Sequence, residues 1–247
     1  MPNSENILHG ITFVEYVAPQ PIVVDENAAV NGNWADYYNT NEPIDLSIIR
    51  TLKGGMYNTL CLPFELGSTG SMENAFGAGY ELLKLKDATL SEGGVLNLTF
   101  EQKTTLEYGV PYLIKPVADV VNPSFTGRKI KTTTASTYTR GDVDFVGTFI
   151  VDEIPASENN LFLGPNNTLY FPTGNTAIKG MRAWFRVNIP GANHVVKHAR
   201  IIAGEQVVTE IDLLNEFNNE TGKTIENGQL IILRDGNRYN VMGIRLQ

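Results

Sequence analysis

Four short runs of the chain alternate apolar and polar residues with a period of two. They cover residues 44–48, 96–100, 143–151 and 181–187, and each places its apolar side chains on one face. A period of two with one polar face is typical of half-buried antiparallel strands. Clusters of Gly, Pro and Asn separate the runs at short intervals, which favours a sandwich over an α/β fold. We therefore expect an all-β protein, built as an antiparallel β-sandwich.

The apolar run 57–64 indicates where the core lies. Leu60 and Leu62 point to one face and Cys61 to the other, so both faces are nearly apolar. We expect a central strand of the sandwich that ends at Pro63, because proline cannot donate a hydrogen bond inside a sheet. Cys61 is the only cysteine, which rules out an internal disulfide. We expect it to be a small buried hydrophobic residue.

The C-terminal part predicts a second, smaller unit. An Asn-Gly pair precedes the apolar run 229–234 and an Asp-Gly pair follows it. Both dipeptides favour the positive φ angles that tight hairpins need. We expect a β-sandwich domain over residues 1–208 and a small β-hairpin or meander module over 209–247. The best candidate for a helix is the short segment 211–217.

The balance of charge and hydropathy excludes several partners. The 247 residues carry 19 Lys and Arg against 27 Asp and Glu, a net charge of -8. An acidic surface repels phosphate backbones, so nucleic acid is not expected as a partner. No apolar stretch approaches the roughly 20 residues of a membrane-spanning helix. The first residues lack the basic end and apolar segment of a signal peptide, which leaves either a cytoplasmic chain or one whose signal has been removed.

Two histidines have a spacing that raises the question of a metal. His194 and His198 are four residues apart, which places two ring nitrogens on one ion only in a helix. Their β-branched surroundings predict a strand, where this spacing separates them by about 13 Å. We expect ordinary strand or loop histidines and no metal.

The densest acidic residues are Asp142, Asp144, Asp152 and Glu153. A glycosidase needs two carboxylates that face each other across a cleft. Asp142 and Asp144 share the polar face of their strand, so we expect them to face solvent. The alternative is a calcium site built from these acids and loop carbonyls.

Sequence motifs for catalysis are absent. The chain contains no nucleophile elbow, Walker motif, dinucleotide fingerprint or metal-binding cysteine pair. We therefore expect no enzyme and no cofactor, with a glycan-active hydrolase of dispersed carboxylates as an alternative.

One loop combines three aromatic residues with polar ones and is the best candidate for a binding site. Trp34, Tyr37 and Tyr38 could stack on sugar rings, with Asp36 and neighbouring asparagines bonding hydroxyls. The alternative is that one or two of these rings close the end of the sandwich. Trp184, on the polar face of its strand, is a second candidate, with cross-strand packing as the alternative.

Several segments resemble a known group of proteins. Residues 57–64, YNTLCLPF, resemble a WNTLCLPF signature of secreted or surface proteins of Bacteroidetes, some found alongside BspA-like leucine-rich-repeat antigens. Further segments are similar to strands of that group in the same order: EYGVPYLIK, FVGTF, LFLG, LY and KGMRAWF. The tail 227–243 is similar to short C-terminal modules of the same bacteria. The chain departs from the pattern at Tyr57, where Trp is usual, and at Trp184, where Tyr is usual.

The resemblance covers residues 45–247 and implies a secreted or cell-surface location, with a signal sequence absent from this chain. It implies no catalytic residue. We expect a non-enzymatic interaction protein, adhesin-like or glycan-binding, whose partner is a surface glycan or a host or bacterial surface protein. The alternative is a structural spacer or anchoring domain without a ligand, whose C-terminal module serves in sorting or attachment.

Overall fold

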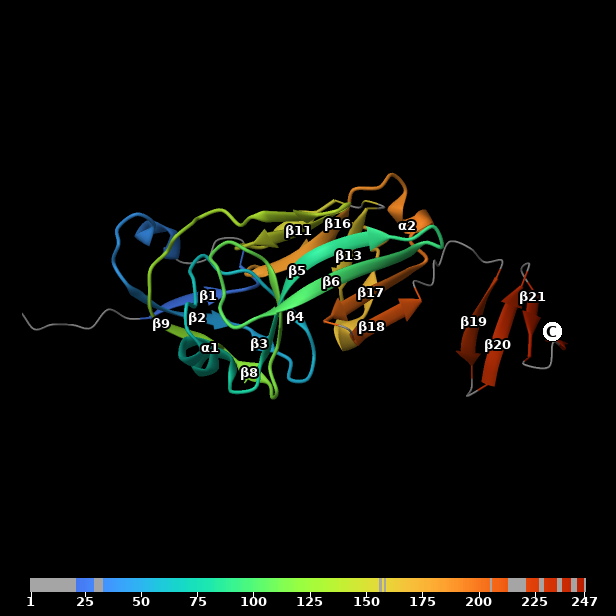
Figure 1. Cartoon of the computed structure of the whole chain (residues 1–247), viewed down its shortest axis with the longest axis horizontal. Coiled ribbons are helices and arrows are strands. Elements are labelled where there is room, and N and C mark those ends of the chain that lie inside the picture. The colour runs from blue at the N-terminus through green and yellow to red at the C-terminus, as the bar shows by residue number, and fades with distance from the viewer. Residues whose placement is uncertain are drawn as a thin grey trace, which may run out of the picture.

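The computed structural model describes residues 21–28, 33–155, 157, 159–204, 206–212, 221–226, 229–234, 237–240 and 244–246. Strands dominate the regular structure of these residues, so the prediction of an all-β protein is confirmed (Figure 1). The helical segments are short: η1 (Trp34–Tyr37), α1 (Thr69–Phe76), η2 (Pro165–Asn167) and α2 (Ala192–Val195).

Two sheets form the main layers. The six-stranded sheet has the order β18 (Gln206–Asp212), β17 (His198–Ala203), β6 (Val95–Lys103), β5 (Glu81–Leu90), β7 (Tyr112–Lys115) and β4 (Asn58–Leu60). The five-stranded sheet has the order β10 (Thr137–Arg140), β11 (Val143–Thr148), β16 (Arg182–Val187), β13 (Asn160–Leu163) and β14 (Leu169–Tyr170). All four alternating runs coincide with strands, three of them with β6, β11 and β16 and the fourth, 44–48, with β2 (Ile44–Ile49), as their periodicity predicts.

The two sheets share one buried cluster. Phe100 from the six-stranded sheet packs edge-on against Phe145 and Phe185 of the five-stranded sheet, with ring centroids 6.1 and 6.4 Å away. Phe145 and Phe185 stack on each other at 4.4 Å. The layers therefore pack face to face through large apolar side chains, each of which removes its whole surface from water.

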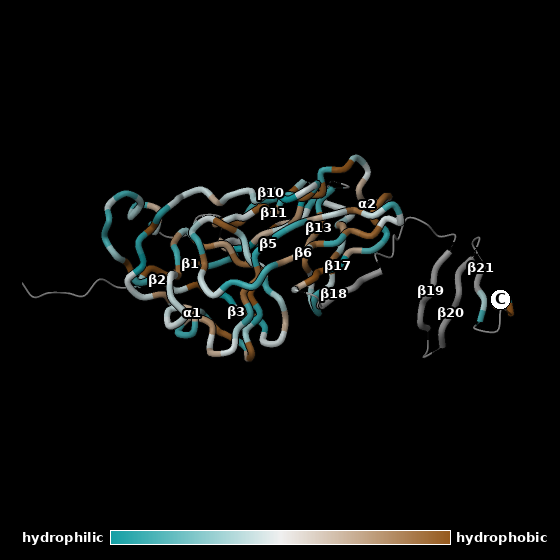
Figure 2. The backbone as a smooth tube through the Cα atoms, in the orientation of Figure 1, coloured by the Kyte–Doolittle hydropathy of each residue, from teal (hydrophilic) through white to brown (hydrophobic). Residues whose placement is uncertain are grey.

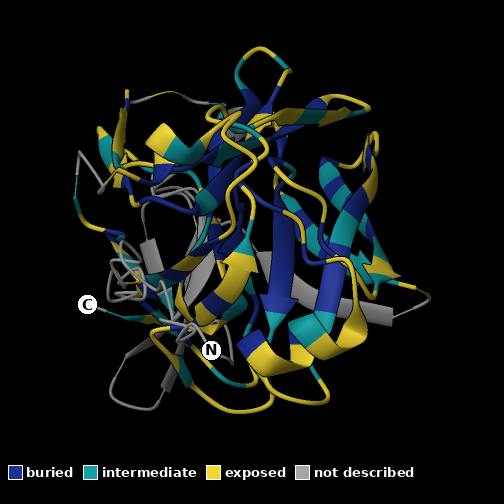
Figure 3. Cartoon of the chain, turned by 90° about the vertical axis from the view of Figure 1, so that its left-hand side faces the viewer, coloured by how far each residue is buried: buried dark blue, intermediate teal, exposed yellow. Residues whose placement is uncertain are grey.

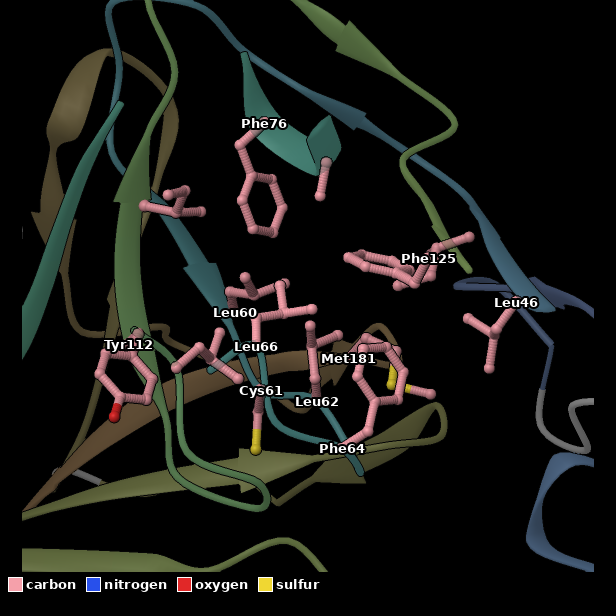
Figure 4. Packing of buried hydrophobic residues seen from close by; sticks show 14 of the residues in the cluster. Leu46, Leu60, Cys61, Leu62, Phe64, Leu66, Phe76, Tyr112, Phe125 and Met181 are labelled. Carbon is pink, nitrogen blue, oxygen red and sulfur yellow. The ribbon is translucent and has the colours of Figure 1, made fainter. Parts of the chain in front are cut away.

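A second core lies against the other face of the six-stranded sheet. A three-stranded sheet of β1 (Ile22–Asp25), β2 (Ile44–Ile49) and β9 (Ser124–Arg128) contributes to it, together with α1. Strands β3 (Thr51–Leu52) and β8 (Val120–Val121) form a short antiparallel pair; β3 follows β2 along the chain, and β8 precedes β9. Neighbouring residues of β7 face opposite cores, with Ile114 in this one and Leu113 in the core between the main layers. Figure 4 shows Phe64, Phe76 and Phe125 meeting in the second core.

Two of the strand pairs depart from the antiparallel arrangement that we expected. Strand β1 pairs with β2 in parallel, and β17 pairs with β6 in parallel. The chain between the members of each pair is long enough to return to the same end of the sheet, which parallel pairing requires.

Helix α1 was missed because its periodic face is too short to recognise. Met72, Ala75 and Phe76 bury one side of two turns. The Ser68 side chain caps the helix by accepting a hydrogen bond from the Ser71 N–H at 3.2 Å. Gly77 ends it with a φ of 82°, a value that glycine adopts without steric cost.

The apolar run 57–64 is not a central strand. Its strand β4 ends the six-stranded sheet beside β7. The run is buried because the chain leaves the sheet at Cys61, whose N–H donates to the Met181 carbonyl at 3.3 Å, and enters the second core. Leu60, Cys61, Leu62 and Phe64 are fully buried there, which confirms the expectation of a buried cysteine.

The C-terminal strands form an antiparallel sheet of β19 (Thr221–Glu226), β20 (Gln229–Arg234), β21 (Asn237–Tyr239) and β22 (Arg245–Leu246). Strand β20 coincides with the predicted run 229–234, while the turn dipeptides around it lie outside the described residues. Residues 211–212 belong to β18, so the prediction of a helix is wrong for them, and 213–217 lie outside the described residues. None of the helices in the described part of the chain is long and apolar enough to cross a membrane.

Candidate functional site

The predicted aromatic loop forms the helical turn η1, with Trp34 as its anchor. Trp34 is only 4% exposed and packs edge-on against Phe149, with ring centroids 5.6 Å apart. Tyr37 is half-buried against the same core. The indole is therefore not available for stacking on a ligand. Trp34 therefore packs in the core, as the alternative interpretation expected, and does not present its ring to solvent.

The exposed side of this loop contains Tyr38, Asp36 and Asn39. The Tyr38 side chain is 41% exposed, and the other two are exposed as well. The Tyr38 N–H donates to the Ala35 carbonyl at 3.0 Å, and the Thr40 hydroxyl donates to the Tyr37 carbonyl at 2.9 Å. These bonds order the backbone around the exposed ring.

The loop lies at one end of the molecule. It is the mostly hydrophilic segment at the left of Figure 2, and that end faces the viewer in Figure 3, where exposed residues run along the loops. Asn39 and Asn41 adopt φ angles of 65° and 62°, a left-handed conformation that asparagine tolerates better than most residues. Lys129 fastens the end of the loop by donating to Asn41 Oδ1 at 2.8 Å.

The second candidate, Trp184, lies in a transverse row on the outer face of the five-stranded sheet. Val146 pairs with Trp184, and Phe162 pairs with Tyr170. The pairing of β13 with β16 places Phe162 beside Trp184. We call Trp184, Phe162 and Tyr170 the aromatic row, which Val146 extends on β11. Trp184 and Phe162 are 8% and 6% exposed, whereas Tyr170 at the open end is 41% exposed.

A two-stranded sheet covers the buried part of this row. Its strands are β12 (Asp152–Ile154) and β15 (Thr176–Ile178), which we call the ribbon. Ile154 and Ile178 of the ribbon form one buried cluster with Phe162 and Trp184. The outer face at Trp184 is therefore apolar and covered, not the polar face that alternation predicts.

Polar residues flank the row. On one side, Arg186 Nη2 and Nε donate to Asp144 Oδ2 at 2.6 and 3.1 Å, and the Thr139 hydroxyl donates to Oδ1 at 2.6 Å. Burial raises the pKa of Asp144, but bonds from Thr139, Arg186 and Asn188 outweigh it and hold that pKa below its ordinary value. The expectation that Asp144 faces solvent is wrong, since it is 6% exposed.

The buried carboxylate of Glu26 lies within ion-pair distance of three cationic side chains next to the ribbon. Glu26, 6% exposed, accepts bonds from Arg182 at 2.7 and 2.9 Å and from Lys179 at 3.3 Å. The Arg50 Nε lies 3.4 Å from the same carboxylate. We call these four residues the charge clamp.

Arg50 extends the charge clamp into the core. Its Nη1 donates to the Met181 carbonyl at 3.1 Å and its Nη2 to the Thr59 carbonyl at 2.8 Å. Burial lowers the pKa of Arg50 to about 9, with Arg182 acting in the same direction and Glu26 against it. A charge buried this fully depends on its counter-ion, so the clamp ties β1, β4 and β16 together.

The remaining candidates for chemistry lie apart from one another. His194 belongs to α2 and His198 begins β17, so the pair shares neither a helix nor a strand. Asp152 and Glu153 are exposed on the ribbon. Within the described ranges, no group of three or more His, Cys, Asp or Glu side chains is placed to hold a metal ion. Burial raises the pKa of the Cys61 thiol, which opposes formation of a nucleophilic thiolate.

Neither protein-family models, nor curated proteins, nor solved structures gave a match to this chain.

Sequence reasoning singled out Trp34, Tyr38 and Trp184 as candidates, and the structure exposes Tyr38 and buries both tryptophans. It missed the charge clamp, because Glu26, Arg50, Lys179 and Arg182 are scattered along the chain. Ile154 and Ile178 each stand out as a large apolar residue beside polar ones, and this was the available signal for the ribbon.

Proposed function

We propose that this protein is a non-enzymatic extracellular or cell-surface interaction protein, adhesin-like, that binds glycans through the loop 33–43. The observation that supports the proposal is a difference in exposure between Trp34 in η1 and Tyr38, which directly follows η1. Trp34 is buried as an anchor, whereas Tyr38 is exposed beside Asp36 and Asn39.

The exposed groups suit a saccharide. A tyrosine ring offers a flat apolar face to the C–H side of a sugar, and its hydroxyl provides a polar edge. The carboxylate of Asp36 accepts hydrogen bonds from hydroxyls, and the amide of Asn39 both donates and accepts. An aromatic face together with a few polar groups that fix orientation is what small-ligand sites use.

The ordering of the loop supports binding over a passive role. Its backbone bonds and the buried Trp34 fix Tyr38 before a ligand arrives, which lowers the entropic cost of association. Loops held by a rigid β scaffold are common sites of recognition. The resemblance to Bacteroidetes surface proteins supports a secreted or cell-surface location.

The test is a binding screen of the purified protein against a glycan array and immobilised host-matrix proteins. We expect the wild-type protein to bind at least one glycan and Tyr38→Ala to lose that signal. Tyr108→Ala is the matched control, since Tyr108 is 45% exposed and lies in another loop. Binding of no array member by the wild-type protein would favour the spacer or anchoring role, with the C-terminal sheet as the attachment element.

A further inference from the structure

The ribbon is the far end of a ladder that bends. Thr148 pairs with Arg182 in the five-stranded sheet, and Asp152 pairs with Ile178 in the ribbon, so one antiparallel register continues on both sides. The residues between, 149–151 and 179–181, leave the ladder. Because the ribbon's isoleucines pack on Phe162 and Trp184, the ladder folds back over the outer face of its own sheet.

The bend itself is firmly held. Met181 has a φ of 56°, and a Cβ atom at Gly180 would lie 2.8 Å from the Phe149 carbonyl oxygen. The Gly180 N–H donates to the Glu26 carbonyl at 2.8 Å. The Glu26 carboxylate also accepts hydrogen bonds from Lys179 and Arg182, on either side of the bend. The position of the bend is thereby fixed from within the core.

Few contacts hold the ribbon beyond the bend. In the described part of the chain its two strands pair only with each other. Ile154 and Ile178 are its buried residues, while Asp152, Glu153 and Ala177 are exposed. An isolated pair of short strands is marginal in water, and regions with few buried contacts open locally at lower free energy than the rest of a fold.

We propose that the ribbon is a displaceable cover over the aromatic row, and that the uncovered row binds a chain of sugar rings. The choice of ligand class rests on the proposed function. Tyr170 already presents an open end, and its ring lies 6.0 Å from that of Phe162 at an interplanar angle of 31°.

The surroundings of the row fit the same ligand. Neighbouring strands lie about 4.8 Å apart, so aromatic side chains on adjacent strands recur at close to the length of one sugar residue. Arg186 and Asn160 border one side of the row and Arg182 the other. The two arginines are bonded to Asp144 and Glu26 and keep part of their side chains exposed. Displacing the ribbon would extend the open surface from Tyr170 to Trp184.

Hydrogen exchange tests the cover directly and without a ligand. Amides of 152–154 and 176–178 are expected to exchange at least 100-fold faster than those of 143–148 and 182–187, which share their register. Equal protection of the two parts, within threefold, overturns the cover. Ile178→Ala should accelerate exchange in the ribbon alone, and Ile150→Ala, at a 46% exposed position before β12, should leave it unchanged.

A soluble panel of cellohexaose, chitohexaose, mannohexaose and hyaluronan tests the ligand class. At least one member should raise the exchange of the ribbon amides, and Tyr170→Ala should weaken its binding about tenfold while Tyr108→Ala does not. If no member alters ribbon exchange, or if Tyr170→Ala binds as wild type does, the sugar assignment is overturned. The proposed function is tested separately, by the loss of glycan binding in Tyr38→Ala on the array. The displaceable cover is tested by hydrogen exchange alone.

Discussion

The thiol of Cys61 occupies the space that a side chain at Gly147 would need. A Cβ atom at Gly147 would lie 2.6 Å from Cys61 Sγ and 3.1 Å from the Ala135 Cβ. Figure 4 shows the sulfur pointing out of the apolar cluster, and it donates to the Gly109 carbonyl at 3.3 Å. Residue 147 of β11 requires glycine because the chain just after β4 approaches β11 closely at Cys61, although the φ of Gly147 is ordinary.

Gly147→Ala is expected to destabilise the protein by about 1–3 kcal/mol, the usual cost of overpacking. Urea unfolding measures the change. Gly70→Ala is the control, because no heavy atom lies within 4 Å of its Cβ position in α1, and alanine favours a helix. Adding Cys61→Ala to Gly147→Ala should recover part of the loss; a double variant no more stable than Gly147→Ala alone would contradict the contact.

Glu26→Gln is expected to cost about 3–5 kcal/mol, because it leaves the buried Arg50 without its counter-ion. Asp119→Asn is the matched control, because its ion pair with Lys53 at 2.8 Å is close in length to the 2.7 Å pair of Arg182 with Glu26 but is exposed. Exposed ion pairs contribute little to stability. The comparison is made by chemical denaturation at neutral pH. Similar losses in the two variants would mean that the charge clamp does not hold the fold.

Acid should weaken the protein in part through Asp144. Its pKa is lowered in the folded state, so its stabilising effect is complete above the unfolded value of about 3.9 and is lost as the pH falls through the folded pKa. Asp144→Asn should therefore show a smaller drop in unfolding free energy between pH 7 and pH 2 than the wild-type protein. An unchanged drop would show that this carboxylate does not couple folding to protons.

Trp34→Ala is expected to cost about 3–5 kcal/mol, as for other buried aromatic residues. Tyr38→Ala should change stability by no more than about 0.5 kcal/mol, because an exposed side chain away from the core contributes little. Thermal and urea unfolding of both variants provide the test. A Trp34→Ala protein as stable as the wild type would place the indole outside the core.

The sequence predicted those features that depend on local pattern. The strands around Leu46, Leu98 and Phe145 follow from alternation, since one apolar face requires one buried side. The order of strands did not follow, because parallel pairing of β17 with β6 depends on where a long connection returns. Trp184 was misjudged for a related reason: alternation says which way a side chain points, not what covers it.

The candidate site divides in the same way. The composition of the loop identified Tyr38, but the side of the loop on which Trp34 lies depends on Phe149, more than a hundred residues away. The charge clamp and the ribbon depend entirely on contacts between distant segments, which one sequence does not reveal.

The affinity of Tyr38→Ala for the strongest glycan found in the array tests the central claim most directly. Titration calorimetry compares it with the wild-type protein and Tyr108→Ala. A loss of one ring contact worth about 1.4 kcal/mol would weaken binding tenfold, with the unfolding free energy unchanged, while Tyr108→Ala binds normally. An affinity of Tyr38→Ala equal to that of the wild type would contradict the assignment of this loop as the binding surface.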